Sequence, residues 1–218
     1  MSNSKEGEEA SWGSIVEDVD LKLMIKQSGL TAVENLLTAR STMYPTVYFH
    51  PFARGAELML ARATNEAISS GKITIDNFTE FTDHKLLSEL DKAGGLSKQI
   101  VKNFENRNIA KRAVSITKEQ AESSGLEKSR REEYESTIAS KLGISPSEIY
   151  VDIPSFSVLP GLKAKILKSN GEIDLARNLS RLVSGLYEAQ FDHWRCRVYG
   201  PESVRKELEK VSETVLGV

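Results

Sequence analysis

The side chains of this sequence that are best suited to bind an anion are concentrated in residues 31–63. Read as a helix, this stretch repeats apolar residues at steps of three and four, and Arg40 lies within that apolar stripe. A cation among apolar residues needs a partner, and its planar guanidinium group matches the oxygens of a phosphate. Further polar side chains follow within a few turns, which predicts one wall of a site for an anionic ligand. This predicted wall consists of Arg40, Tyr44, Tyr48, His50 and Arg54.

Each residue of the predicted wall also has a structural interpretation, which the sequence leaves open. Arg40 could pair with a buried acid such as Glu57. The two tyrosines could be core aromatics with satisfied hydroxyl groups, and His50, which precedes Pro51, could cap a helix.

The sequence offers no complete reaction centre. Its three histidines lie in separate segments, without a His-x-x-x-His or His-Asp pair, so a metal ion that activates water is hard to assemble. Cys196 is the only cysteine and alternates with Trp194 and Val198 in a predicted strand, which favours a buried structural thiol. A nucleophilic serine motif, a glycine-rich phosphate loop and a Cys-x-x-Cys motif are absent from the sequence.

The composition is that of an ordinary soluble globular protein. Charged residues make up 28 %, hydrophobic residues 39 %, and the net charge is -2. The sequence contains neither a run of eighteen apolar residues nor a signal-peptide core, so we expect no membrane span. A single cysteine fits a reducing compartment, and we expect a cytoplasmic protein.

Nucleic-acid binding is a weaker alternative because abundant glutamate dilutes the basic residues. The residues that would carry it are Arg107, Lys111, Arg112, Arg195 and Arg197. Arg195 and Arg197 alternate with inward residues of a predicted strand, so we expect them on its solvated face.

Local signals predict how the wall is positioned. Thr31 and Glu34 have the spacing of a capping box and predict a helix that starts at residue 31. Pro45 should break or kink this helix. Pro51 can open a second helix, which ends at Gly71.

The remaining patterns predict a mainly α fold with a small α+β lobe at the C-terminus. Short helices are expected at about 82–92, 97–106 and 127–142. The lobe should contain strands at 150–156 and 193–200, a hairpin at Asn170–Gly171 and a last helix. The predicted parts are a disordered tail at 1–11, a helical portion at 12–116, an exposed helical excursion at 117–144 and the α+β lobe at 145–218.

Several segments resemble the HD-domain phosphohydrolases, a group that includes deoxynucleoside triphosphate triphosphohydrolases. LLTARSTMYPTVYFHPFARGAELMLARA, residues 36–63, is similar to the helix pair in the second half of their catalytic domain. ENRNIAKRA, YVDIPSF and WRCRVYGPESVRKELEK resemble later segments of the family, so the resemblance spans most of residues 14–218. The resemblance implies that residues 12–116 form an HD-domain-like helical portion.

The resemblance also implies roles for single residues. Arg40 would contact a substrate phosphate, Tyr48 would stack near the sugar, and His50 would line the same pocket. Asp20 resembles the last metal-ligating aspartate of the family, although the pair Asp18 and Asp20 also fits a simple turn or helix start.

The sequence departs from the family at its metal centre. The N-terminal half, with its separate histidine and its His-Asp pair, has no counterpart, and Leu21 and Pro51 replace lysines usual in the family. One aspartate does not hold an ion against water. The resemblance therefore implies an HD-type nucleotide phosphohydrolase relative that is inactive alone.

The resemblance leaves cofactor and partners as expectations. We expect no cofactor in this chain alone, and Mn²⁺ or Mg²⁺ if the missing half is supplied. The expected partners are a nucleotide or another phosphate ligand, and either further copies of the chain or a partner chain that carries the metal half. The alternative is a non-catalytic oligomerisation or regulatory nucleotide-binding protein.

Overall fold

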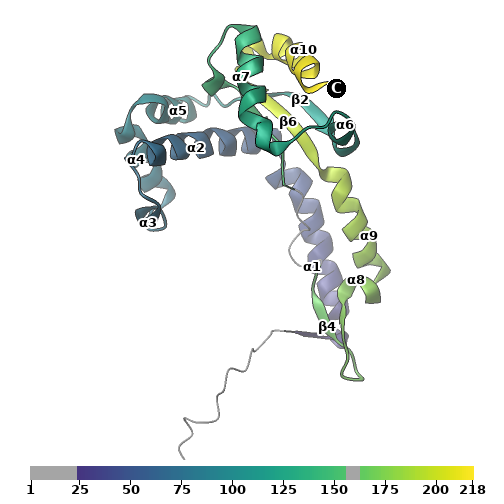
Figure 1. Ribbon diagram of the computed structural model, residues 1–218. Helices are drawn as coiled ribbons and strands as arrows, with labels where there is room; N and C mark the ends of the chain where they lie inside the picture. The colour runs from purple at the N-terminus through teal and green to yellow at the C-terminus, as the bar shows by residue number, and fades with distance from the viewer. Residues whose placement is uncertain (1–23, 156–162) are drawn as a thin grey trace, which may run out of the picture.

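The computed structural model describes residues 24–155 and 163–218 (Figure 1). The candidate ligand Asp20, its neighbour Asp18 and the predicted tail at residues 1–11 lie outside these ranges. The described part is mainly α-helical with small β-sheets, which confirms the predicted fold class. Within it no helix is long and apolar enough to cross a membrane, and the cytoplasmic location stays a prediction.

A central antiparallel sheet carries the strands nearest to the site. Its strands, in spatial order, are β2 (Lys111–Thr117), β6 (Arg195–Gly200) and β3 (Tyr150–Asp152). The helices packed against it are α7 (Arg131–Leu142), α10 (Arg205–Leu216) and α2 (Pro51–Ser69). α7 and α10 cover one face through a buried apolar cluster that includes Cys196, as predicted for this thiol. α2 contacts the sheet through the other cluster, which contains Tyr150 and Tyr199, so both faces of β6 are covered.

α2 extends away from the sheet into a helical arm (Figure 1). The arm also contains α3 (Ile75–Phe78), α4 (Asp83–Ala93) and α5 (Gly95–Glu105). Met59, Ala63 and Ala67 of α2 pack with Leu90 and Ile100 in its core. The helices expected at 82–92 and 97–106 therefore form, and they bury Leu90 and Ile100.

A second arm is built around α1 and runs downward in the view, away from the arm of α2 (Figure 1). Its helices are α1 (Leu30–Met43), α8 (Ala176–Leu179) and α9 (Arg181–Ala189). Its strands, in spatial order, are β1 (Ile25–Lys26), β4 (Lys165–Leu167) and β5 (Ile173–Leu175). Val33 and Leu37 of α1 pack on Ile166, Ala176 and Val183 in the core of this arm.

Short elements connect these parts. They are η2 (Gln27–Gly29), η3 (Tyr44–Tyr48), α6 (Lys118–Ser123), η4 (Lys128–Arg130), η5 (Pro146–Glu148), η6 (Gln190–His193) and η7 (Glu202–Val204). η3 is one turn of π-helix that contains Pro45, so the chain widens the helix there instead of breaking it at once. α2 then begins at Pro51, as expected from a proline at the first helical position.

Some local signals act differently from what their spacing predicted. α1 begins at Leu30 without a side-chain cap among the described residues, and Glu34 instead accepts a hydrogen bond from the Ser180 hydroxyl group. The hairpin at Asn170–Gly171 forms, with Gly171 at a φ of 85°, and joins β4 to β5. It pairs with β1 rather than with the sheet that contains β6. The elements predicted for the α+β lobe are thus divided between two sheets.

β2 was not predicted, and it lies within the segment assigned to the helical portion and the start of the excursion. It pairs with β6, with a register irregularity between Arg112 and Val114, and β6 is about eighty residues further along the chain by number. α7, in the predicted excursion, packs on this sheet instead of standing away from it. The predicted helical portion, excursion and α+β lobe therefore all contribute elements to, or pack on, the sheet that contains β6.

Candidate functional site

The structure places Arg40 on an exposed surface. α1 packs on its own arm through Val33 and Leu37, whereas Leu36 and Met43 are 67 % and 45 % exposed. Arg40 lies within the apolar stripe predicted from the spacing, but α1 buries only the face with Val33 and Leu37, so Arg40 is exposed to solvent. Arg40 Nη2 donates to Tyr44 Oη at 3.3 Å, and its guanidinium carbon lies 5.8 Å from the Tyr44 ring centroid.

Tyr48 and His50 lie at the junction between η3 and α2. Tyr48 is 49 % exposed, and its ring centroid is 5.0 Å from that of Tyr44. His50 caps α2, because its Nδ1 accepts a hydrogen bond from the Phe52 backbone N–H at 3.3 Å. This is the structural role left open for His50, and a ligand contact of either residue stays a prediction.

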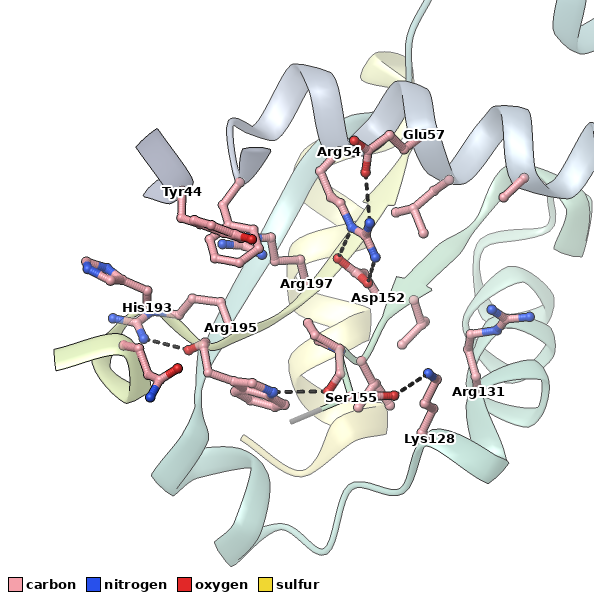
Figure 2. Close-up of a pocket in the computed structure, with 18 residues that line it drawn as sticks. Tyr44, Arg54, Glu57, Lys128, Arg131, Asp152, Ser155, His193, Arg195 and Arg197 are labelled. Carbon is pink, nitrogen blue, oxygen red and sulfur yellow. Dashed lines mark hydrogen bonds and ion pairs between the residues drawn. The ribbon is translucent and has the colours of Figure 1, made fainter. Parts of the chain in front are cut away.

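The remaining two residues of the predicted wall line a cavity of about 540 Å³ (Figure 2). Tyr44 and Arg54 reach it from η3 and α2, while the end of β3, the start of α7 and the segment from η6 to β6 form its other walls. Its volume is within the usual range for small-molecule sites. The basic side chains that line it are Arg54, Lys128, Arg131, Arg195 and Arg197, the acidic ones are Glu57 and Asp152, and His193 is also present.

Arg54 binds both carboxylates of the cavity. Its Nε and Nη2 donate to Asp152 Oδ2 and Oδ1, each at 2.8 Å, and its Nη1 donates to Glu57 Oε2 at 2.8 Å. The Asp152 side chain is 4 % exposed and that of Arg54 is 31 % exposed. The hydrogen bonds and charge of Asp152 raise the pKa of Arg54. Because both carboxylates are bound to Arg54, they are not free to pair with the other basic groups.

Arg197 is the exceptional residue of the cavity. It is 6 % exposed, and its Nε has no hydrogen-bond partner within the described chain. Its guanidinium carbon lies 5.7 Å from the ring centroid of Phe49. Asp152 faces Arg197 across the β3–β6 pairing, but the carboxylate of Asp152 is bound to Arg54. Burial lowers the pKa of Arg197, because this environment solvates its charge poorly.

The expectation that Arg197 lies on a solvated strand face is wrong. β6 is the middle strand of its sheet, and the face with Arg197 and Tyr199 is covered by α2 and the residues before it. The Tyr199 hydroxyl group is also buried without a partner in the described ranges, and burial raises the pKa of Tyr199 to about 12. Buried polar groups without partners are costly in a folded protein, so they often mark places where a ligand binds.

The other basic groups of the cavity have neutral partners or acids that they do not bind closely, among them Glu119, whose charge interacts with that of Arg195. Lys128 Nζ donates to Ser155 Oγ at 2.7 Å, and Arg195 Nη1 donates to the backbone carbonyl groups of Asp192 and Trp194, both at 2.7 Å. Arg131 lies 3.9 Å from carboxylate oxygens of Glu132 and Glu135. The cavity therefore has an excess of positive charge near its wall.

Sequence reasoning missed this arrangement because its parts are distant in the chain. Lys128, Arg131 and Asp152 were not singled out, and Arg195 and Arg197 were assigned to a solvated face. The available signal was the alternation of arginine with apolar residues in WRCRVY, which also fits a strand that is buried on both faces. Across the described ranges, His, Cys, Asp and Glu side chains do not gather in groups of three or more that could hold a metal ion.

Comparison with known proteins gives a match over nearly the whole chain. A family model described as "HD associated region" matches residues 14–218. An uncharacterised protein from Methanocaldococcus jannaschii is 24 % identical over 201 residues, which cover 87 % of this chain and 42 % of the relative. The uncharacterised protein YwfO from Bacillus subtilis is 24 % identical over 217 residues, covering 84 % of this chain and 48 % of YwfO. The chain thus spans less than half the length of these two relatives.

Two solved structures share the fold at low sequence identity. A phosphohydrolase from Bacteroides thetaiotaomicron superimposes with a TM-score of 0.53 at 18 % identity, covering 83 % of this chain and 52 % of the other. A hypothetical protein from Aquifex aeolicus gives a TM-score of 0.57 at 22 % identity, covering 87 % of this chain and 47 % of the other.

Proposed function

The chain belongs to the HD associated region family, and from this premise we propose that it is the phosphate-binding part of an HD-type phosphohydrolase. The description of the family and the name phosphohydrolase of one structural neighbour support this class of function. The ligand is a nucleotide or a related compound that presents phosphate oxygens to the cavity.

The observation that carries this proposal is the burial of Arg197 beside a cavity rich in basic groups. The Nε–H group of Arg197 lacks a hydrogen-bond partner in the described chain. A phosphate group supplies both an acceptor for that N–H and the missing negative charge. A purely structural arginine at this depth would be expected to pair with an acid. Asp152, which lies opposite Arg197 on β3, is bound to Arg54.

A catalytic metal would need ligands from a partner. A divalent ion, Mn²⁺ or Mg²⁺, would be held by ligands supplied from outside the described ranges, with Asp20 as one candidate. The exposed face of α1 and η3, with Leu36, Met43 and Val47, offers an apolar surface for the domain that supplies them. The chain alone is then inactive.

The same exposed face favours a second candidate, a non-catalytic protein that assembles into oligomers and binds a nucleotide for regulation. Leu36, Met43 and Val47 are large apolar side chains with 67 %, 45 % and 52 % exposure, as at subunit interfaces. The two candidates differ in one outcome. Adding a metal-bearing HD domain should restore hydrolysis for the first candidate and should not for the second.

Titration calorimetry with deoxyadenosine triphosphate and with inorganic triphosphate tests the binding proposal. We expect one site per chain, and the substitution Arg197→Met should weaken binding by about 10- to 100-fold because it removes a charged hydrogen-bond donor. Arg205→Met is the matched control, since Arg205 is exposed and pairs loosely with Glu202. The isolated chain with Mn²⁺ should release no triphosphate. Equal affinities of Arg197→Met and the unmodified chain would show that the phosphate ligand does not bind in this cavity.

A further inference from the structure

The basic groups of the cavity form two separate sets. Arg195 and Arg197 belong to β6 and are called the β6 pole, whereas Lys128 and Arg131 belong to η4 and α7 and are called the α7 pole. Figure 2 shows Lys128 and Arg131 across the cavity from Arg195, with Ser155 between the two sets.

The topology explains this separation. β3 lies at the edge of the sheet next to β6, and α7 packs against β3. Lys128 reaches the cavity beside Ser155, just beyond the end of β3, while Arg195 and Arg197 enter from β6. The end of β3 and the residues after it thus lie between the poles.

The wall between the poles is apolar. Val151, Ile153, Pro154 and Trp194 line the cavity together with Leu58 and Ala61 of α2. The Trp194 indole N–H donates to the Pro154 carbonyl oxygen at 3.0 Å, so this polar group is already satisfied and fixes the ring. Such a wall favours an uncharged, partly apolar part of a ligand and disfavours a charged one.

Acids lie near both poles, but each pole keeps one basic group without an ion pair. Glu132 and Glu135 lie 3.9 Å from Arg131, and the charge of Glu119 interacts with that of Arg195. The carboxylates that line the cavity, Asp152 and Glu57, are bound to Arg54, so Lys128 and Arg197 form no ion pair within the described ranges. A single phosphate group placed at Arg197 leaves Lys128 without a negative partner. Two anionic groups, one at each pole, supply a partner to both.

We propose that the ligand of this cavity carries an anionic group at each end of an uncharged middle, as in a nucleoside phosphorylated on both its 5′ and 3′ hydroxyl groups. This inference rests on the proposed phosphate-binding function and specifies the class of ligand. One phosphate lies at Arg197 and Arg195, the nucleoside lies against Trp194 and Pro154, and the other phosphate lies at Lys128 and Arg131.

Two nucleotides of equal composition provide the test. Adenosine 3′,5′-bisphosphate and adenosine 5′-diphosphate both contain two phosphate groups and differ in their placement. We expect calorimetry to show that the bisphosphate binds about tenfold or more tightly than the diphosphate. Equal affinities, or tighter binding of the diphosphate, would overturn the inference.

Variants of the α7 pole provide an independent measurement. The double substitution Lys128→Met and Arg131→Met should weaken binding of the bisphosphate about tenfold or more while changing that of the diphosphate little. Arg130→Met is the control, because Arg130 is a neighbour that pairs with Glu133 and does not line the cavity. An equal loss for both nucleotides, or no loss for either, would contradict the two-ended ligand.

The outcomes separate this inference from the proposed function. If neither nucleotide nor inorganic triphosphate binds, the phosphate-binding function fails and this inference fails with it. If the diphosphate or triphosphate binds through Arg197 but the bisphosphate gains no affinity, only the two-ended ligand is wrong.

Discussion

Replacing Arg197 with methionine should raise the free energy of unfolding of the unliganded chain by about 1–3 kcal/mol. The substitution removes a buried hydrogen-bond donor without a partner, which costs the folded state about this much. Arg197 is 6 % exposed, its Nε lacks a partner in the described chain, and burial lowers its pKa. Methionine keeps much of the side-chain length and can still pack on Phe49, but it removes the charge that this environment solvates poorly. The measurement is urea denaturation of both forms without ligand.

The stability of the variant distinguishes a ligand contact from a structural arginine. If the guanidinium group mainly holds the fold together, methionine should lower the free energy of unfolding by more than about 1 kcal/mol. If it is kept for a ligand, the more stable variant should lose the binding described above, as residues of binding sites often reduce stability. Arg205→Met should leave stability within about 0.5 kcal/mol of the original value.

The substitution Asp152→Asn should have the opposite effect on stability and lower the free energy of unfolding by about 3 kcal/mol. Asp152 accepts two hydrogen bonds from Arg54 at 2.8 Å, and its side chain is 4 % exposed. Asparagine presents one oxygen and one amino group to the same pair of donors, so one donor loses its partner and the Arg54 charge is no longer balanced there. Urea denaturation again provides the measurement.

Glu57→Gln is the matched control for Asp152→Asn. Glu57 accepts from the same arginine, but its side chain is 53 % exposed, so water can replace it and the loss should stay below about 1 kcal/mol. Removing the Asp152 charge should also keep or increase the affinity of the cavity for triphosphate, because it takes a negative charge away from the site. Equal losses of stability for the two substitutions would show that the buried Arg54–Asp152 pair stabilises the fold no more than the exposed Arg54–Glu57 pair.

The structure explains which parts of the fold could be predicted from the sequence. Pro51 and Asn170–Gly171 act through their own backbone preferences, so the start of α2 and the hairpin were predictable. Their neighbours in space were not, because the hairpin pairs with β1, more than a hundred residues away by number. β2 was missed because its pairing with β6 is also a long-range contact.

The site shows the same limit more sharply. Spacing placed Arg40 in an apolar stripe, but the periodicity of a helix does not tell which face a neighbour covers, and α1 buries the adjacent face. Arg197 was assigned to solvent because alternation along a strand does not tell whether both faces are covered. Tyr44 and Arg54 of the predicted wall do reach the cavity, and their roles as ligand contacts stay predictions.

The most direct test is to observe the Nε–H group of Arg197 while a phosphate ligand is added. Nitrogen-15 spectra of the arginine Nε–H groups, with the Arg197 signal assigned through its loss in Arg197→Met, report on this single donor. We predict that the signal shifts progressively and reaches saturation as inorganic triphosphate is added, whereas the signal of Arg205 does not move. Triphosphate that binds without shifting the Arg197 signal, or that does not bind at all, would contradict the assignment of Arg197 as the phosphate contact.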